Sequence, residues 1–448
     1  MRHLVVHPAA APLLGSVPVP SDKSVGHRAL LFSAICHGKS RIVGFSRGED
    51  NLATLQALRA LGVRIDEVSQ AELVVEGVGI FGLCAPTAPL DCGNSGTTMR
   101  LMAGLLAAQP FTSTLIGDAS LSSRPMMRVA APLRARGAAI SGAPHRSKAD
   151  EITAPLTIGP LPEGEYLREI EYDSPVASAQ VKSALLLSGL YAHGVTTVNE
   201  PSVSRDHTER MMRALGVPLT TFGSIVTLDP AGWNGQMAAF DIALPGDISA
   251  SAFLSVAAAI VPGSRVTVRS VGVNPTRTGL LEIARDMGVG LSIEAREDAG
   301  GEPTADLVTW ATALRAAAIG GETVTRAIDE VPIVCALAAR ASGVTKISGA
   351  GELRVKESDR IAAMIKVLRA FGVKCEEHGD GLSIEGGDGP LKAAVIDSQG
   401  DHRIAMTAAV MALVGDGPTR IVNAECIATS FPKFVGTLRA LGAKIDVE

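Results

Sequence analysis

The chain has 448 residues, enough for two or three domains with hydrophobic cores of their own. Hydrophobic residues make up 46% of it, which excludes general disorder, and aromatic residues only 3%, which argues against the stacking surfaces of single-strand nucleic-acid binders. The formal net charge is −5, so the chain as a whole does not attract nucleic acid, and any anion site must be local.

The cysteines and the N-terminal segment indicate the compartment. No two of the six cysteines have C-x-x-C spacing, so neither a zinc site nor a redox pair is indicated, and reduced thiols are expected. Residues 1–19 lack the apolar core of a signal peptide, and no uncharged apolar stretch reaches membrane-spanning length. We therefore expect a cytoplasmic protein with no membrane partner.

The first polar segment in chain order covers residues 20–28. Lys23 and Ser24 lie at an expected strand-to-helix junction, and Arg28 follows about one turn later. A helix N-terminus offers free N–H groups and partial positive charge, so these side chains suit an anion site. A capped helix with solvated basic residues fits the segment equally well.

Four further segments of the first half share this pattern. Residues 93–100 form a Gly-rich turn before an apolar helix expected over 101–108, without the Walker or dinucleotide signature. Arg124 precedes Pro125 at an expected helix start, where a bound anion would offset the unfavourable helix dipole. Residues 178–183 and 204–208 open further helices and carry hydroxyl, amide and basic groups.

In the second half, residues 328–332 place two carboxylates before a very apolar helix expected over 333–341. Taken alone, these carboxylates indicate an N-terminal cap. Residues 353–360 include five charged side chains, and residues 400–406 form a polar cap that leads into another apolar helix. If these helix N-termini face one cleft, their dipoles and basic side chains suit a ligand pair that carries several negative charges.

A helix–glycine–strand phrase recurs six times along the chain. It reads Leu-Arg-Ala-Leu-Gly-Val in its first copy, and its glycines recur every 70 to 84 residues, at Gly62, Gly137, Gly216, Gly288, Gly372 and Gly442. Each copy predicts an amphipathic helix, a glycine in the left-handed C′ position and an apolar strand. Six copies of an αβ unit predict two domains of three units each, over 20–243 and over 1–19 plus 244–448.

Taken in order, the segments resemble the 5-enolpyruvylshikimate-3-phosphate synthase family over nearly the whole chain. The motifs are D-K-S-x-x-H-R, G-N-S-G-T-T-x-R, A-S-A-Q-V-K-S-A, R-D-H-T, D-E-x-P, L-R-x-K-E-S-D-R and D-H-R-I-A-M. The resemblance implies an α/β clamp of two domains, each with three βαβαββ-like units whose helix N-termini face the interdomain cleft. It also implies transfer of the enolpyruvyl group of phosphoenolpyruvate to shikimate 3-phosphate in aromatic amino acid biosynthesis. No metal or cofactor is implied, and we expect a monomer.

The resemblance also implies roles for individual residues. Lys23 corresponds to a contact with both substrates, Asp329 to the base at the 5-hydroxyl, and Lys356 and Glu357 to groups that orient the hydroxyl and move protons. The other shikimate 3-phosphate contacts implied are Ser24, Arg28, Ser178, Ala179, Gln180 and Arg205. The other phosphoenolpyruvate contacts implied are Gly96, Arg124, Gln180, Arg360 and Arg403.

Two positions depart from the patterns of some relatives. A lysine found in some relatives is absent here, which leaves Thr429 or Lys433 as candidates for one phosphate contact. Gly96 stands where inhibitor-tolerant relatives carry Ala, so glyphosate sensitivity is left open, and the space beside Gly96 favours a sensitive enzyme.

The sister transferase that acts on a UDP-amino sugar would need a cysteine in the 117–123 loop and an asparagine in place of Ser24, and this chain has neither. A catalytically inactive, anion-binding relative is the other alternative.

Overall fold

The computed structural model describes residues 3–448 and divides into two compact units. Unit 2 comprises Ser21–Leu244 and Ala299–Glu302, and unit 1 comprises Met1–Pro20, Pro245–Asp298 and Pro303–Glu448. The short stretch Ala299–Glu302, which the sequence placed with the second half, therefore belongs to unit 2. Within residues 3–448, no helix is both long and apolar enough to cross a membrane.

Every sheet repeats one plan. The six four-stranded sheets each begin with an edge strand that pairs in parallel with the second strand, and the second pairs antiparallel with the third. A parallel pair needs a crossover connection. In four of these sheets helices lie between the two parallel strands in the sequence, in the βαβ manner, and in the other two sheets most of unit 2 lies between them. The repeat is therefore a βαβαββ unit, and the α/β fold predicted from the phrase is confirmed.

Unit 2 contains the sheets β14-β3-β5-β4, β6-β7-β9-β8 and β10-β11-β13-β12. Its helices are α1 (Lys23–Ile35), α2 (Glu49–Ala60), α3 (Gly96–Leu106), α4 (Met127–Ala135), α5 (Ala179–Gly189) and α6 (His207–Ala214). Its strands are β3 (His37–Val43), β4 (Arg64–Ser69), β5 (Glu72–Val78), β6 (Leu90–Asp91), β7 (Ser113–Ile116), β8 (Ala139–Pro144), β9 (Ile152–Gly159), β10 (Leu167–Asp173), β11 (Ala192–Asn199), β12 (Leu219–Phe222), β13 (Ile225–Leu228) and β14 (Asp241–Ala243).

Unit 1 contains the sheets β16-β17-β15-β2, β18-β19-β21-β20 and β22-β23-β1-β24. Its helices are α7 (Ile248–Ile260), α8 (Gly279–Asp286), α9 (Gly321–Arg326), α10 (Val331–Arg340), α11 (Arg360–Ala370), α12 (His402–Ala412) and α13 (Phe434–Ala440). Its strands are β1 (Leu4–Val6), β2 (Leu14–Val17), β15 (Arg265–Gly272), β16 (Gly290–Ala299), β17 (Glu302–Trp310), β18 (Ala318–Ile319), β19 (Gly343–Ile347), β20 (Lys374–His378), β21 (Gly381–Gly386), β22 (Val395–Asp397), β23 (Thr419–Val422) and β24 (Ile445–Val447).

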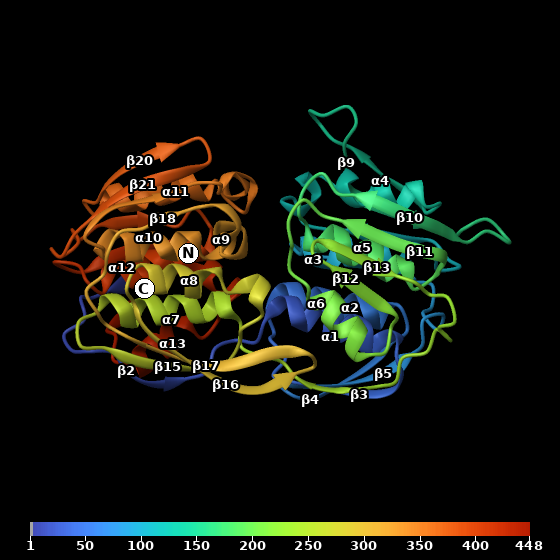
Figure 1. Cartoon of the computed structure of the whole chain (residues 1–448), viewed down its shortest axis with the longest axis horizontal. Helices are drawn as coiled ribbons and strands as arrows, with labels where there is room; N and C mark the ends of the chain where they lie inside the picture. The colour runs from blue at the N-terminus through green and yellow to red at the C-terminus, as the bar shows by residue number, and fades with distance from the viewer. Residues whose placement is uncertain (1–2) are drawn as a thin grey trace. The chain divides into compact units, whose positions relative to one another are not determined.

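The N-terminal segment completes two sheets of unit 1. β1 lies between β23 and β24, so the start and the end of the chain share one sheet, and β2 pairs in parallel with β15 (Figure 1). β14, which directly precedes α7 in the chain, instead pairs in parallel with β3 of unit 2. β2 and β14 thus each belong to a sheet of one unit and lead into the first helix, α1 or α7, of the other unit.

The six phrase glycines all adopt the predicted conformation. Their φ angles range from +77° to +109°, and each glycine directly follows the C-cap of α2, α4, α6, α8, α11 or α13. In the first copy, the N–H of Gly62 donates to the carbonyl of Arg59 and that of Val63 to the carbonyl of Leu58, the bond pair of a Schellman motif. The other five copies form the same pair of bonds.

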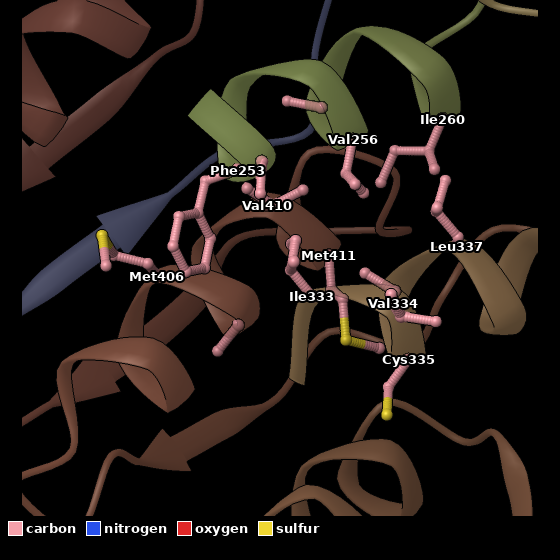
Figure 2. Close-up of a cluster of buried hydrophobic side chains, with 14 of the residues drawn as sticks. Phe253, Val256, Ile260, Ile333, Val334, Cys335, Leu337, Met406, Val410 and Met411 are labelled. Carbon is pink, nitrogen blue, oxygen red and sulfur yellow. The ribbon is translucent and has the colours of Figure 1, made fainter. Parts of the chain in front are cut away.

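The first helices of the three repeats form the core of each unit. In unit 1, α7, α10 and α12 pack against one another through side chains such as Phe253, Val334 and Met411 (Figure 2). In unit 2, α3 packs against both α1 and α5. Helices this apolar are buried nearly all round, so the polar residues that the sequence places at their N-termini are held by a rigid core.

Three predicted boundaries were wrong. The helix expected over 101–108 begins at Gly96, so the Gly-rich turn supplies its first turn. Pro125 does not start a helix, because α4 begins at Met127 after the N-cap Met126. Asp329 is not the N-cap of α10, because it lies in a 3-10 turn (Ile328–Glu330) and the N-cap residue is Glu330.

Candidate active site

Lys23 begins α1 as the sequence predicted. The N-cap Asp22 accepts hydrogen bonds from the backbone N–H groups of Ser24 and Val25, at 2.7 and 3.0 Å. The ammonium of Lys23 is 2.8 Å from a carboxylate oxygen of Asp50 at the start of α2. Burial acts to raise the pKa of Asp50, but the charge and hydrogen bond of Lys23, together with neighbouring groups such as Arg124, hold that pKa below its ordinary value. Lys23 is therefore a charged, partly exposed group with a fixed position.

Arg28 lies deeper than the sequence suggested. Its guanidinium donates to Thr208 Oγ1 at 2.6 Å, to Ser183 Oγ at 2.7 Å and to the carbonyl of Ser24 at 3.0 Å. Its pKa is lowered to about 10, chiefly by burial and in part by the neighbouring charge of Arg205. Arg28 thus joins α1 to α5 and α6, and half-buried Arg205 lies within its electrostatic reach.

Three arginines gather near the start of α3. Arg124 donates to the side-chain oxygen of Asn94 at 2.5 Å, and Arg100 donates to Gln180 Oε1 at 2.7 Å. The pKa of Arg100 is lowered to about 10, chiefly by burial and in part by the neighbouring charges of Arg124 and Arg128. Like charges held together at a helix N-terminus favour an anion that neutralises them.

Gly96 lies against this cluster. A Cβ built on Gly96 would stand 2.7 Å from Arg100 Nη1 and 3.3 Å from Arg124 Nη1. Any larger residue at this position must therefore displace guanidinium groups, although these are the ends of flexible side chains.

The N-terminus of α5 carries the next candidate residues. Ser178 is its N-cap and accepts from the N–H of Val181, and Ala179 is its first residue. Gln180 donates to Thr97 Oγ1 at 2.9 Å and accepts from Arg100, so it connects α5 to α3. The residues predicted from the first half of the chain therefore line adjoining helix starts in unit 2.

In unit 1, Asp329 lies between two guanidinium groups. Its carboxylate oxygens are 3.6 Å from Arg360 Nη1 and 3.8 Å from Arg403 Nη2. Its backbone carbonyl accepts a hydrogen bond from Arg403 at 2.9 Å. A carboxylate beside two cations stays ionised at neutral pH and is available to accept a proton.

Arg360 is buried among carboxylates. It donates to Asp401 at 2.9 Å and to Glu357 at 2.7 Å, and only 1% of its side chain is exposed. Burial opposes its charge, but Glu357, Asp401 and Asp329 together raise its pKa. The side chain of Glu357 is 40% exposed, and although its partial burial acts to raise its pKa, the charges of Arg360 and Arg403 hold that pKa below its ordinary value, so Glu357 is ionised in this structure.

Asp401 fixes the start of α12. One of its oxygens caps the N–H of Arg403 at 2.9 Å, and the other accepts from Arg360 and from Ser358 Oγ. His402 beside it is neutral, because burial and the charge of Arg403 lower its pKa to about 3. The cap expected from the sequence is confirmed, and it also orients both arginines.

Three further candidate residues lie elsewhere in unit 1. The ammonium of Lys356 is 2.8 Å from Glu352, an exposed residue one turn earlier. Lys433 is exposed at the N-cap of α13, and Thr429 ends a 3-10 turn that packs beside α12. Neither arrangement distinguishes Thr429 from Lys433 as the extra phosphate contact.

Sequence reasoning missed three residues that hold the site in place. Arg100 lies in the motif G-N-S-G-T-T-x-R but was assigned no role, Asp401 was read only as a cap, and Asp50 was not considered. The Arg100 position was visible, since it ends a Gly-rich segment one turn into a helix. The pairing of Asp50 with Lys23 depends on how α1 and α2 pack, and no local pattern reports that. Across residues 3–448, no group of three or more His, Cys, Asp or Glu side chains could hold a metal ion.

Comparison with known proteins identifies the family. The sequence profile described as EPSP synthase (3-phosphoshikimate 1-carboxyvinyltransferase) matches residues 8–438. A 3-phosphoshikimate 1-carboxyvinyltransferase of Geobacter sp. (strain M21) is 50% identical over 439 residues, which cover 98% of this chain and 99% of the relative. The corresponding protein of Methylococcus capsulatus is 48% identical and covers 97% of this chain and 96% of its own length. An EPSP synthase structure from Acinetobacter baumannii superposes with a TM-score of 0.90 at 44% identity, with both chains fully covered. The chain therefore belongs to the EPSP synthase (3-phosphoshikimate 1-carboxyvinyltransferase) family.

Proposed function

We propose that this chain transfers the enolpyruvyl group of phosphoenolpyruvate to the 5-hydroxyl of shikimate 3-phosphate and releases phosphate, a step of aromatic amino acid biosynthesis. Membership of the family supports the reaction. The observation that carries the proposal is Asp329, a carboxylate that lies between Arg360 and Arg403. A base that is flanked by two anion-binding cations suits a reaction in which a hydroxyl loses a proton beside a bound phosphate.

We assign shikimate 3-phosphate to the hydroxyls, helix N-termini and basic residues of α1, α5 and α6. The hydroxyl of Ser178 and the amide of Gln180 suit its alcohol groups, and Arg205 suits its phosphate. The full set proposed is Lys23, Ser24, Arg28, Ser178, Ala179, Gln180, Arg205, Asp329 and Lys356. Because Arg28 already donates three hydrogen bonds within unit 2, its contribution to the ligand is chiefly long-range charge.

We assign phosphoenolpyruvate, which carries a phosphate and a carboxylate, to the segments that contain Arg124, Arg360 and Arg403. The set proposed is Lys23, Gly96, Arg124, Gln180, Arg360 and Arg403. Arg100, which contacts Gln180 and lies beside Gly96, adds positive charge to this set. Planar guanidinium groups bind carboxylate and phosphate through paired hydrogen bonds, which explains why arginine dominates here.

The proposed chemistry is addition followed by elimination. Asp329 takes the proton of the 5-hydroxyl as that oxygen bonds to C2 of phosphoenolpyruvate, while an acid delivers a proton to C3. The tetrahedral ketal phosphate then loses phosphate from C2 and a proton from the C3 methyl, which restores the double bond. Each well-placed acid or base contributes roughly 10²–10⁴-fold to such a step.

The group that handles the proton at C3 is constrained by Arg360. Glu357 is held ionised by Arg360, so it is poised to accept a proton rather than to give one. A phosphoenolpyruvate anion that draws Arg360 towards itself would weaken this ion pair and raise the pKa of Glu357, which would allow it to act as an acid. Lys23 remains the alternative donor, and Lys356 is occupied by Glu352.

Phosphate release is the direct test of the proposed function. The full chain is incubated with shikimate 3-phosphate and phosphoenolpyruvate, and inorganic phosphate and the enolpyruvyl product are quantified. Stoichiometric formation of both is expected. Release with UDP-N-acetylglucosamine in place of shikimate 3-phosphate would assign the sister reaction, and binding of both substrates without release would assign an inactive relative.

Replacing Gly96 with Ala is expected to raise the KM for phosphoenolpyruvate several-fold with a smaller change in the KM for shikimate 3-phosphate. The added methyl would displace Arg100 and Arg124, which we assign to the phosphoenolpyruvate side. Steady-state kinetics of both substrates measure the split. Inhibition by glyphosate, measured in parallel, is expected to weaken in the variant, and an unchanged inhibition curve would contradict the assignment of Gly96.

We further propose a cytoplasmic monomer. All six cysteines carry free thiols, which supports a reducing compartment. Sedimentation velocity of the full chain at several concentrations measures the oligomeric state, and a concentration-dependent shift towards a dimer would overturn the monomer.

A further inference from the structure

A buried group of three ionisable side chains underlies α5 in unit 2. The ammonium of Lys182 is 2.7 Å from a carboxylate oxygen of Glu200 and 2.8 Å from one of Glu209. Each of the three side chains is at most 2% exposed. Buried charges persist only when paired, so an arrangement of two carboxylates around one ammonium requires a reason beyond stability.

The two carboxylates differ in what else they contact. One oxygen of Glu200 accepts the backbone N–H of Ser178 at 2.8 Å, and the other accepts the hydroxyl of Ser204 at 2.7 Å and its N–H at 3.4 Å. Glu209, by contrast, has no hydrogen-bond donor on either oxygen among the residues that the structure describes, apart from its ion pair with Lys182. Both carboxylates therefore balance the charge of Lys182, but only Glu200 also accepts hydrogen bonds from the start of α5 and from the segment before α6.

The position of Glu200 explains this reach. It follows β11 directly, and its carboxylate joins the N-cap of α5 to the 200–206 loop that leads into α6. That loop carries Arg205, and the N-cap precedes Ala179 and Gln180. One carboxylate thus sets the spacing between the two segments to which shikimate 3-phosphate is assigned.

We propose that Glu200 is a positioning residue for shikimate 3-phosphate, which holds the start of α5 and the Arg205 loop at the separation that the ligand requires. The proposal rests on the proposed function. The ammonium of Lys182 lies 2.7 Å from Glu200, whose two oxygens accept hydrogen bonds from both segments at once, which the single oxygen of an amide could not do. Glu209 balances the charge of the ammonium and also lies within electrostatic reach of Arg28, but it makes no hydrogen bond to the start of α5 or to the Arg205 loop among the residues that the structure describes.

The variants Glu200→Gln and Glu209→Gln form a matched pair. Each removes one buried negative charge and leaves Lys182 with one carboxylate, so the electrostatic change is alike. In Glu200→Gln, the amide NH₂ cannot accept from Ser204, whereas Glu209→Gln leaves both segments of the site untouched. Titration calorimetry measures the Kd of shikimate 3-phosphate, and kinetics measure the KM of phosphoenolpyruvate and kcat.

Glu200→Gln is expected to raise the Kd of shikimate 3-phosphate about tenfold, equivalent to about 1.4 kcal/mol. The KM of phosphoenolpyruvate should rise less than the Kd of shikimate 3-phosphate, since Gln180 is the only residue assigned to phosphoenolpyruvate that lies on the two segments held by Glu200. Glu209→Gln is expected to leave both constants within about twofold of those of the unmodified chain. Equal increases in both variants, or no increase in Glu200→Gln, would overturn the proposal.

Ser204→Ala provides a second route if Glu200→Gln does not fold. It removes the hydroxyl that donates to Glu200 and leaves all three charges in place. A several-fold rise in the Kd of shikimate 3-phosphate is expected, and an unchanged Kd would count against the positioning role. Failure of the unmodified chain to turn over the two substrates would instead refute the proposed function, so the two failures are distinguishable.

Discussion

Replacing Asp329 with Asn is expected to lower kcat by roughly 10²–10⁴-fold, because the amide cannot accept the proton of the 5-hydroxyl. Asn has nearly the same shape, so the turn ahead of α10 should persist. Arg360 and Arg403 would lose a neighbouring negative charge, which lies 3.6 and 3.8 Å from them. The KM for phosphoenolpyruvate is therefore expected to stay constant or fall, which separates loss of the base from loss of binding.

Initial rates of phosphate release at saturating substrates measure this effect. Glu322→Gln is the control, since it neutralises an exposed carboxylate on α9 in the same unit and should leave kcat unchanged. If Asp329→Asn kept more than about a tenth of the activity, Asp329 could not be the base, since one such group supplies at least about 10²-fold. A rise in the KM for phosphoenolpyruvate without a fall in kcat would make Asp329 a binding residue instead.

Local sequence signals predicted much of the fold. Each phrase glycine has a positive φ, because the chain leaves the helix through the left-handed C′ position of a Schellman motif. Glycine adopts this conformation without steric cost. The caps at Asp22, Ser178 and Asp401 were readable because a short polar side chain before an apolar run satisfies the free N–H groups of the helix. The alternation of helix and strand then left few ways to form sheets.

Those local signals did not predict which side chains from distant parts of the sequence contact one another. Asp329 looked like a cap, and only the packing of α10 beside α11 and α12 brings Arg360 and Arg403 to it. The same holds for Arg28, whose acceptors Ser183 and Thr208 lie far along the chain on α5 and α6. Such contacts depend on tertiary structure, so residue types at helix starts identified the candidates without showing which of them are ligands and which are supports.

The largest effect on stability is expected at Lys182. Replacing it with Met leaves Glu200 and Glu209 buried without a cation, and removal of one partner from a buried ion pair costs about 3–5 kcal/mol. Arg64→Met in the same unit is the control: Arg64 is 68% exposed and 3.2 Å from Asp66, and exposed pairs contribute less than about 1 kcal/mol. The midpoint of urea unfolding, followed by a signal from unit 2, measures both variants.

The deficit of Lys182→Met is expected to grow with pH. Burial already raises the pKa of Glu209 above its ordinary value of 4.5, and Lys182 counteracts this rise. Without the ammonium, both carboxyl groups should have raised pKa values, so the folded state binds more protons than the unfolded state above about pH 4.5. Stability therefore falls as pH rises through that range, and the variant should approach the unmodified chain in stability near pH 4.5.

A double variant distinguishes loss of charge balance from loss of packing. Lys182→Met with Glu209→Gln leaves one uncompensated carboxylate where the single variant leaves two, so it should regain part of the lost stability and show a shallower dependence on pH. A loss of stability caused by removal of the lysine's aliphatic stem would instead depend neither on Glu209 nor on pH. That loss should be small, since methionine replaces most of the stem's volume. A double variant as unstable as the single one at every pH would mean that Lys182 stabilises unit 2 through packing, and that its two carboxylates are neutral in the folded chain.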